Sequence, residues 1–163
     1  MNNFDLTSSG GDFSGLEEEK VPVLLFIQGA QYYEGVDPGN VELMTEGTME
    51  VMGDTYRLSY EESELTGMEG TTTTFEVRGP RVTLTRAGGV NSQMVFEEGR
   101  QHTSLYETPY GELSIDVQTS RLQHSLSKQG GKMEIHYSIA VEHTAAGRNT
   151  FKIRIRPKGP GSN

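Results

Sequence analysis

Alternation of apolar and polar residues with a period of two is the feature that most limits how this chain can fold. Between residues 132 and 142, Met133, Ile135, Tyr137, Ile139 and Val141 are interrupted by Glu134, His136 and Ser138. The segments 82–85, 113–117 and 151–155 repeat the pattern. A period of two places successive side chains on opposite faces of a strand, so each segment is predicted to be a half-buried β-strand with one wet face.

Turn signals separate these strands from further strand-like runs. Only residues 61–68 could form a helical turn, and the abundance of Gly and Thr argues against helix elsewhere. The turn signals are Gly53-Asp54, Gly79-Pro80, Gly88-Gly89, Pro109-Tyr110-Gly111 and Gly130-Gly131. The other candidate strands are 23–33, 41–52, 55–61, 72–78, 93–97 and 103–107.

Short strands joined by tight turns predict an antiparallel meander. Such a meander loses its exposed edges when it closes on itself. We therefore expect an all-β fold, a single closed antiparallel up-and-down barrel of about eight strands, with an open sandwich as the alternative. The expected boundaries are a disordered leader at 1–20, the barrel at 21–157 and a flexible tail at 158–163.

The charge balance argues against nucleic acid as a partner. The chain has 23 acidic and 14 basic residues, a formal charge of −9, which repels phosphate. Four bases do gather at positions 152, 154, 156 and 158, on the strand face opposite Phe151, Ile153 and Ile155. No aromatic residue is interleaved with these bases, so we interpret them as a solvated strand face.

The N-terminal segment and the absence of cysteine predict a cytoplasmic location. Residues 1–20 contain five acids and a single base, which is unlike a secretory signal. The longest apolar stretch, 21–27, is broken by Pro22 and is far shorter than the roughly 20 residues that span a bilayer, so no membrane partner is expected. Without cysteine, disulfides, thiolate nucleophiles and cysteine-ligated zinc are excluded.

Catalytic, cofactor and metal signatures are lacking. There is no phosphate-binding loop, dinucleotide fingerprint, HExxH, EF-hand or GxSxG motif. The acidic pairs Glu61-Glu62 and Glu97-Glu98 are adjacent on strands and point to opposite faces. The four histidines are scattered and are interpreted as surface residues: His102, His124, His136 and His143. The sequence therefore predicts no catalytic residue, no metal ligand and no cofactor.

Several polar residues continue the apolar faces of strands, and they form the candidate ligand-binding interior. Arg86 follows Val82 and Leu84 on one such face. A buried arginine requires a partner, which could be a carboxylate such as Glu61, tyrosine hydroxyls or the acid group of a ligand. The candidate residues are Tyr56, Tyr60, Glu61, Arg86, Tyr106, Thr119 and Tyr137. The alternative, which the burial of an arginine favours, is an internal network of Arg, Glu and Tyr side chains that fills the barrel and fixes its register.

Four blocks of the sequence resemble the YwiB-like family, small and mostly uncharacterised bacterial proteins with a calycin-like (lipocalin-like) β-barrel. The blocks are GDTYRLSYEESELTGMEGTTTT at 53–74, VTLTRAGG at 82–89, YETPYGELSIDVQT at 106–119 and GKMEIHYSI at 131–139. The resemblance implies an antiparallel barrel of about eight strands and brings no established reaction. Residues that match the blocks include Ser59, Thr71, Pro109 and Gly111, besides the seven candidate residues.

Three functions are compatible with this sequence. The first is a non-enzymatic barrel that binds a small molecule through Arg86 and its tyrosines. The second is a protein-interaction module with a solid, side-chain-filled barrel. The third is an enzyme with an unrecognised carboxylate and tyrosine site. The oligomeric state does not follow from the sequence, and fold resemblance alone does not decide function.

Overall fold

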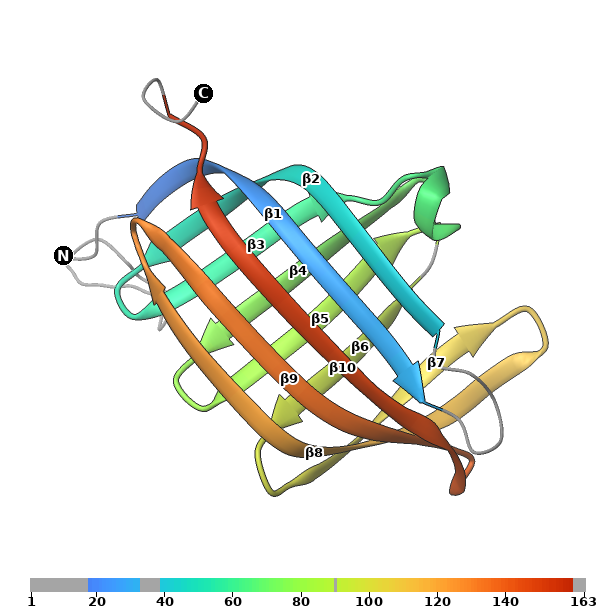
Figure 1. Ribbon diagram of the computed structural model, residues 1–163. Helices are drawn as coiled ribbons and strands as arrows, with labels where there is room; N and C mark the ends of the chain where they lie inside the picture. Colours follow the sequence, from blue (N-terminus) through green and yellow to red (C-terminus); the bar gives the residue numbers. More distant parts are fainter. Residues whose placement is uncertain (1–17, 33–38, 90, 160–163) are drawn as a thin grey trace, which may run out of the picture.

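The computed structural model describes residues 18–32, 39–89 and 91–159, which form ten antiparallel strands and one short 3₁₀ helix (Figure 1). The expected leader, apart from its last residues, and the end of the expected tail lie outside these ranges. None of the described helices is long and apolar enough to cross a membrane. The elements are β1 (Glu18–Tyr32), β2 (Gly39–Met52), β3 (Thr55–Glu61), η2 (Glu64–Thr66), β4 (Thr71–Arg78), β5 (Arg81–Gly88), β6 (Ser92–Glu97), β7 (Gln101–Thr108), β8 (Gly111–Ser127), β9 (Gly130–Val141) and β10 (Thr144–Pro157).

The strands follow one another around a single sheet in the order β6-β5-β4-β3-β2-β1-β10-β9-β8-β7. Every neighbour pair is antiparallel, and the first strand, β1, pairs with the last, β10 (Figure 1). The all-β, antiparallel, up-and-down prediction is confirmed. The predicted number of about eight strands is wrong: each of the ten strand-like runs forms its own strand. The first strand also begins at Glu18, before the expected barrel start at residue 21.

The sheet is nearly closed, and its seam lies between β6 and β7, which follow each other in the chain but do not pair. Contacts to β8 cross the seam instead. The backbone N–H of Gly99 donates to the Thr119 carbonyl over 2.8 Å, and the N–H of Leu122 donates to the Glu98 carboxylate over 2.9 Å. Further along, Nε2 of His124 lies 2.8 Å from the Gly79 carbonyl oxygen. Side chains and turns therefore complete the wall where the ladder of backbone hydrogen bonds is missing.

The inward faces of the strands form one continuous apolar core. Phe75 and Phe96 are among its largest fully buried side chains. Close packing of strands also fixes Gly131, whose backbone has φ +140°; a Cβ added there would lie 1.8 Å from the Ser125 carbonyl oxygen. Other fully buried side chains of the core are Val23, Leu25, Met49, Leu58, Val77, Val82, Leu84, Val117, Ile135 and Ile153.

Two irregularities change the pattern late in the chain. A bulge between Thr119 and Arg121 shifts the pairing of β8 with β9, so the inward positions change from odd to even numbers. The β9–β10 turn consists of Glu142 and His143, which both have positive φ, 48° and 66°. Such a turn normally favours Asn-Gly.

Candidate functional site

A cavity of about 370 Å³ lies at one mouth of the barrel. Its wall comes from the end of β1, the start of β2, η2, and the inner faces of β5, β9 and β10. Apolar side chains such as Ile27 and Leu43 line part of it, while Tyr60, Glu62 and Arg86 supply polar groups. A mostly apolar concavity with a few polar groups is the usual form of a small-molecule site.

Glu62 is the most buried charged group of the cavity, with 1% of its side chain exposed. Thr73 donates a hydrogen bond to its Oε2 over 2.5 Å, and Thr66 of η2 donates to its Oε1 over 2.9 Å. The guanidinium Nε of Arg86 lies 4.0 Å from Oε2. Both carboxylate oxygens thus have protein partners, and the charge of Glu62 is balanced by Arg86.

Arg86 retains unused hydrogen-bonding capacity. Its side chain is 17% exposed, and its Nε is buried without a hydrogen-bond partner. In the described part of the chain, only Thr119 Oγ1 shares that condition among buried side-chain polar atoms. Buried polar groups nearly always have a hydrogen-bond partner. This guanidinium can therefore donate a hydrogen bond to an acceptor from outside the protein.

Tyr60 lies beside the Arg86–Glu62 pair and is held in its neutral form. Burial raises the pKa of the Tyr60 hydroxyl well above its ordinary value, and the negative charge of Glu62 raises it further. A neutral phenol can donate a hydrogen bond. The next wall of the cavity is aromatic: Tyr137 stacks on Phe151 with ring centroids 5.9 Å apart, and Phe96 lies 4.7 Å from Tyr137.

The seven candidate residues of the sequence analysis do not all meet at this cavity. Tyr60, Arg86 and Tyr137 line it. Glu61 does not: it is exposed and accepts a hydrogen bond from Thr72 outside the barrel. The buried carboxylate is its neighbour Glu62, and the period of two could have identified it, because Glu62 continues the inward row of Tyr60.

The remaining three candidates lie elsewhere. Tyr56 pairs with Val51 and Val77, further along β3 from the cavity. Tyr106, on β7, does not line the cavity. Thr119 is fully buried opposite Tyr137 in the β8–β9 register, yet it is not part of the cavity wall.

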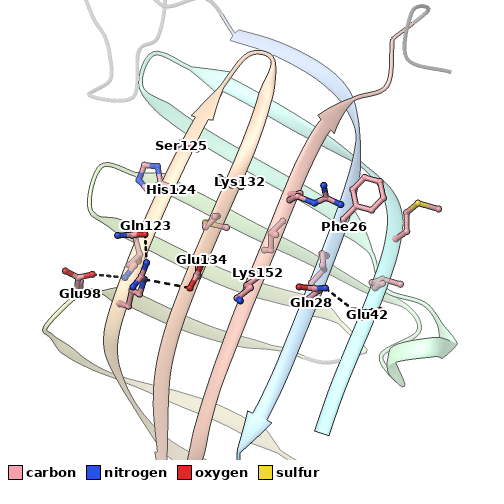
Figure 2. A pocket seen from close by; sticks show the side chains of 18 of the residues that line it. Phe26, Gln28, Glu42, Glu98, Gln123, His124, Ser125, Lys132, Glu134 and Lys152 are labelled. Atoms are coloured by element: carbon pink, nitrogen blue, oxygen red, sulfur yellow. Dashed lines mark hydrogen bonds and ion pairs between the residues drawn. The ribbon is translucent and has the colours of Figure 1, made fainter. Parts of the chain in front are cut away.

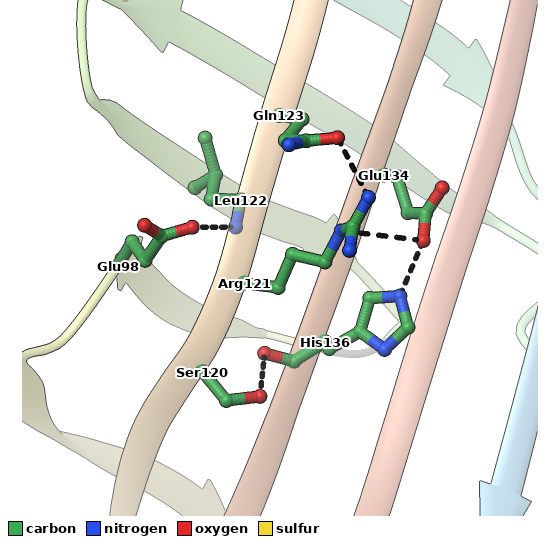
Figure 3. A network of polar contacts seen from close by, with 7 residues as sticks. All are labelled: Glu98, Ser120, Arg121, Leu122, Gln123, Glu134 and His136. Carbon is green, nitrogen blue, oxygen red and sulfur yellow. Dashed lines mark hydrogen bonds and ion pairs between the residues drawn. The ribbon is translucent and has the colours of Figure 1, made fainter.

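A second, larger concavity of about 1450 Å³ runs over the outer face of β8, β9, β10, β1 and β2 (Figure 2). We call this surface the outer groove. Its side chains include Phe26, Lys132 and Lys152. Figure 3 shows the polar network at its β8–β9 side, where Arg121 contacts both Glu134 and Gln123. No group of three or more potential metal ligands occurs in the described ranges.

The chain has relatives of known fold but of undescribed activity. Residues 27–153 match the model of a family described as "Domain of unknown function (DUF1934)". The crystal structure of ywiB protein from Bacillus subtilis is similar with a TM-score of 0.78 and 21% identity, over 92% of this chain and 100% of that one. At this identity the likeness establishes the fold alone. No curated protein matches the chain.

Proposed function

The chain belongs to the DUF1934 family, a domain of unknown function, and we propose that its barrel binds a small molecule in the cavity at its mouth. The observation that carries the proposal is the guanidinium of Arg86, which lines the cavity with part of the side chain exposed and whose buried Nε has no hydrogen-bond partner. A side-chain network that merely filled the barrel would be expected to satisfy this atom.

The donors in the cavity indicate the kind of ligand. Arg86 can donate several hydrogen bonds, whereas Glu62 already accepts from two threonines and the Tyr60 hydroxyl is itself hydrogen-bonded to Glu62. An acceptor-bearing head group, most favourably a carboxylate, fits the guanidinium. Ile27, Leu43 and Phe151 offer contacts to an apolar body. The ligand class is therefore a small organic acid with an apolar chain, bound as in calycin-like barrels.

Calorimetric titration with straight-chain carboxylates of about six to ten carbons, and with the matching alcohols, tests this proposal. We expect one equivalent to bind, with the carboxylate preferred. Arg86→Met should abolish the preference for the carboxylate. Gly29→Val should block binding by filling the cavity, and it should fold, because the nearest atoms to an added Cβ are 3.8 Å away in Phe151. Gln28→Val, one residue away on the outer face of β1, is the control.

Two outcomes would overturn the proposal. If Gly29→Val binds the carboxylates as the wild type does, the cavity is not the site. If no carboxylate binds and native mass spectrometry of the purified chain shows no retained small molecule, the interaction-module hypothesis takes its place.

A further inference from the structure

The outer groove and the strand face around it collect cations that form no close ion pair with the described residues of the protein. Lys152, Arg154 and Arg156 follow one another at alternate positions of β10, and all three are exposed. The first two line the groove, and Arg156 continues the row beyond it. Lys132 of β9 lies opposite Arg154 in the register of the two strands. Figure 2 shows Lys132 and Glu134 on β9 and Lys152 on the neighbouring strand β10, opposite Glu134.

Most of the other basic residues of the protein, in contrast, form ion pairs. All 14 Lys and Arg residues lie in the described ranges; seven of them form ion pairs there, and Arg148 also has an interaction partner. The other six form no ion pair with any residue in the described ranges: Lys20, Arg78, Lys132, Lys152, Arg154 and Arg156. Four of the six thus share one face of a chain whose net charge is −9.

The acids of the outer groove, in contrast, are engaged. Glu42 accepts a hydrogen bond from Gln28 over 3.0 Å, and Glu98 accepts one from the backbone N–H of Leu122 over 2.9 Å (Figures 2 and 3). Glu134 contacts both His136 and Arg121, and the hydrogen bond with the His136 imidazole lowers the pKa of the Glu134 carboxyl. Lys152, opposite Glu134, also helps to lower that pKa, so Arg154 and Arg156 are the cations of β10 most available to charge from outside.

An aromatic ring holds two of these cations in place. The guanidinium carbons of Arg154 and Arg156 lie 5.1 Å and 5.6 Å from the centroid of the Phe26 ring on the neighbouring strand β1. Met44, opposite Phe26 on β2, is 66% exposed. The interpretation of these bases as a merely solvated face assumed that no aromatic residue accompanies them. The register of β1 and β10 supplies one.

We propose that the outer groove binds an extended acidic segment of a partner protein, lying along β10. Side chains on one face of an extended peptide recur every second residue, at the same spacing of about 6.6 Å as Lys152, Arg154 and Arg156. Carboxylates at alternate positions can therefore meet all three cations at once, while an apolar residue contacts Phe26 and Met44. Single-stranded nucleic acid fits less well, because the Phe26 ring already packs against two guanidiniums and is not an open platform for bases.

Fluorescence anisotropy at low salt tests the proposal with a labelled peptide of about eight residues that alternates Glu and Ser. We expect binding that weakens as salt is raised, because the contacts are exposed ion pairs. The double variant Lys152→Glu/Arg154→Glu should weaken it about tenfold or more, since two attractions become repulsions. A second double variant, Lys132→Glu/Lys152→Glu, leaves both Phe26 contacts intact and should weaken binding as well.

Matched controls separate this site from general charge attraction. Lys20→Glu/Arg78→Glu makes the same change in net charge at the two unpaired cations outside the groove, and it should leave peptide binding within about twofold of the wild type. A peptide with its Glu residues in one block should bind more weakly than the alternating one. Equal losses in the groove and control variants, or no binding of the alternating peptide, would overturn the proposal. Tighter binding of a single-stranded oligouridylate, lost in the groove variants, would replace the peptide with nucleic acid.

Discussion

Replacing one of two adjacent carboxylates should reveal how strongly the cavity depends on its buried charge. In Glu62→Gln, the two hydroxyl hydrogen bonds from Thr66 and Thr73 lose their charged acceptor, at about 1 kcal/mol each. Arg86 also loses its counter-ion at 4.0 Å, which adds about 1 kcal/mol for a partly solvated pair. The free energy of unfolding should therefore fall by about 3 kcal/mol, and Tm by roughly 6–12 °C for a chain of this size.

Glu61→Gln is the matched control, since Glu61 is exposed and accepts a single bond from Thr72. It should change the free energy of unfolding by no more than about 0.5 kcal/mol. Urea and thermal unfolding of both variants, followed by far-UV circular dichroism, measures the difference. If both variants lose the same stability, or if Glu62→Gln is as stable as the wild type, then the buried network is not what holds η2 and β5 around the cavity.

Three other perturbations test further parts of the structure. Burial raises the folded-state pKa of Tyr60, so the stability that this residue contributes to the fold is present below a pH of about 10 and is lost as the pH rises above it. Tyr60→Phe should therefore flatten the decline of Tm at alkaline pH. Hydrogen bonds from Thr103, and to a smaller extent from His143, lower the pKa of Asp116, so the stability that this carboxylate contributes is lost as the pH falls below about 4. In that pH range the Tm of Asp116→Asn should approach the Tm of the wild type. Gly131→Ala should cost about 2–4 kcal/mol in urea unfolding because of its positive φ and the Ser125 carbonyl, whereas Gly29→Ala should cost less than about 1 kcal/mol; similar losses would contradict the packing argument.

The period of two determined most of the fold. It identified the ten strand-like runs and their inward faces, because side-chain direction along a strand depends only on local backbone geometry. It also placed Arg86 and Tyr60 among the inward residues. The number of about eight strands was wrong because it rested on the expected closure of the barrel rather than on the runs themselves.

The alternation with a period of two did not predict the structure where a bulge or an unusual turn changes which positions point inward. Residues 120–127 continue β8, but the bulge after Thr119 moves the inward row to Leu122 and His124, which interrupts the alternation of odd inward positions. The turn at Glu142 and His143 carries no Gly or Asn. It is held from β8, where Ser114 donates its N–H to the Glu142 carboxylate and Asp116 contacts His143. Partners 27 or more residues away in sequence cannot be identified from a local pattern.

Which strands lie next to each other, and therefore which side chains meet, follows from the tertiary structure alone. The sequence places Arg154 and Arg156 on one outer face, but only the pairing of β1 with β10 brings Phe26 beneath them. Likewise, only the folding of η2 over the barrel mouth brings Thr66 to Glu62, and only the β3–β4–β5 register brings Arg86 to the same carboxylate. Alternation specifies which way a side chain points, whereas long-range hydrogen bonding and burial specify what it meets.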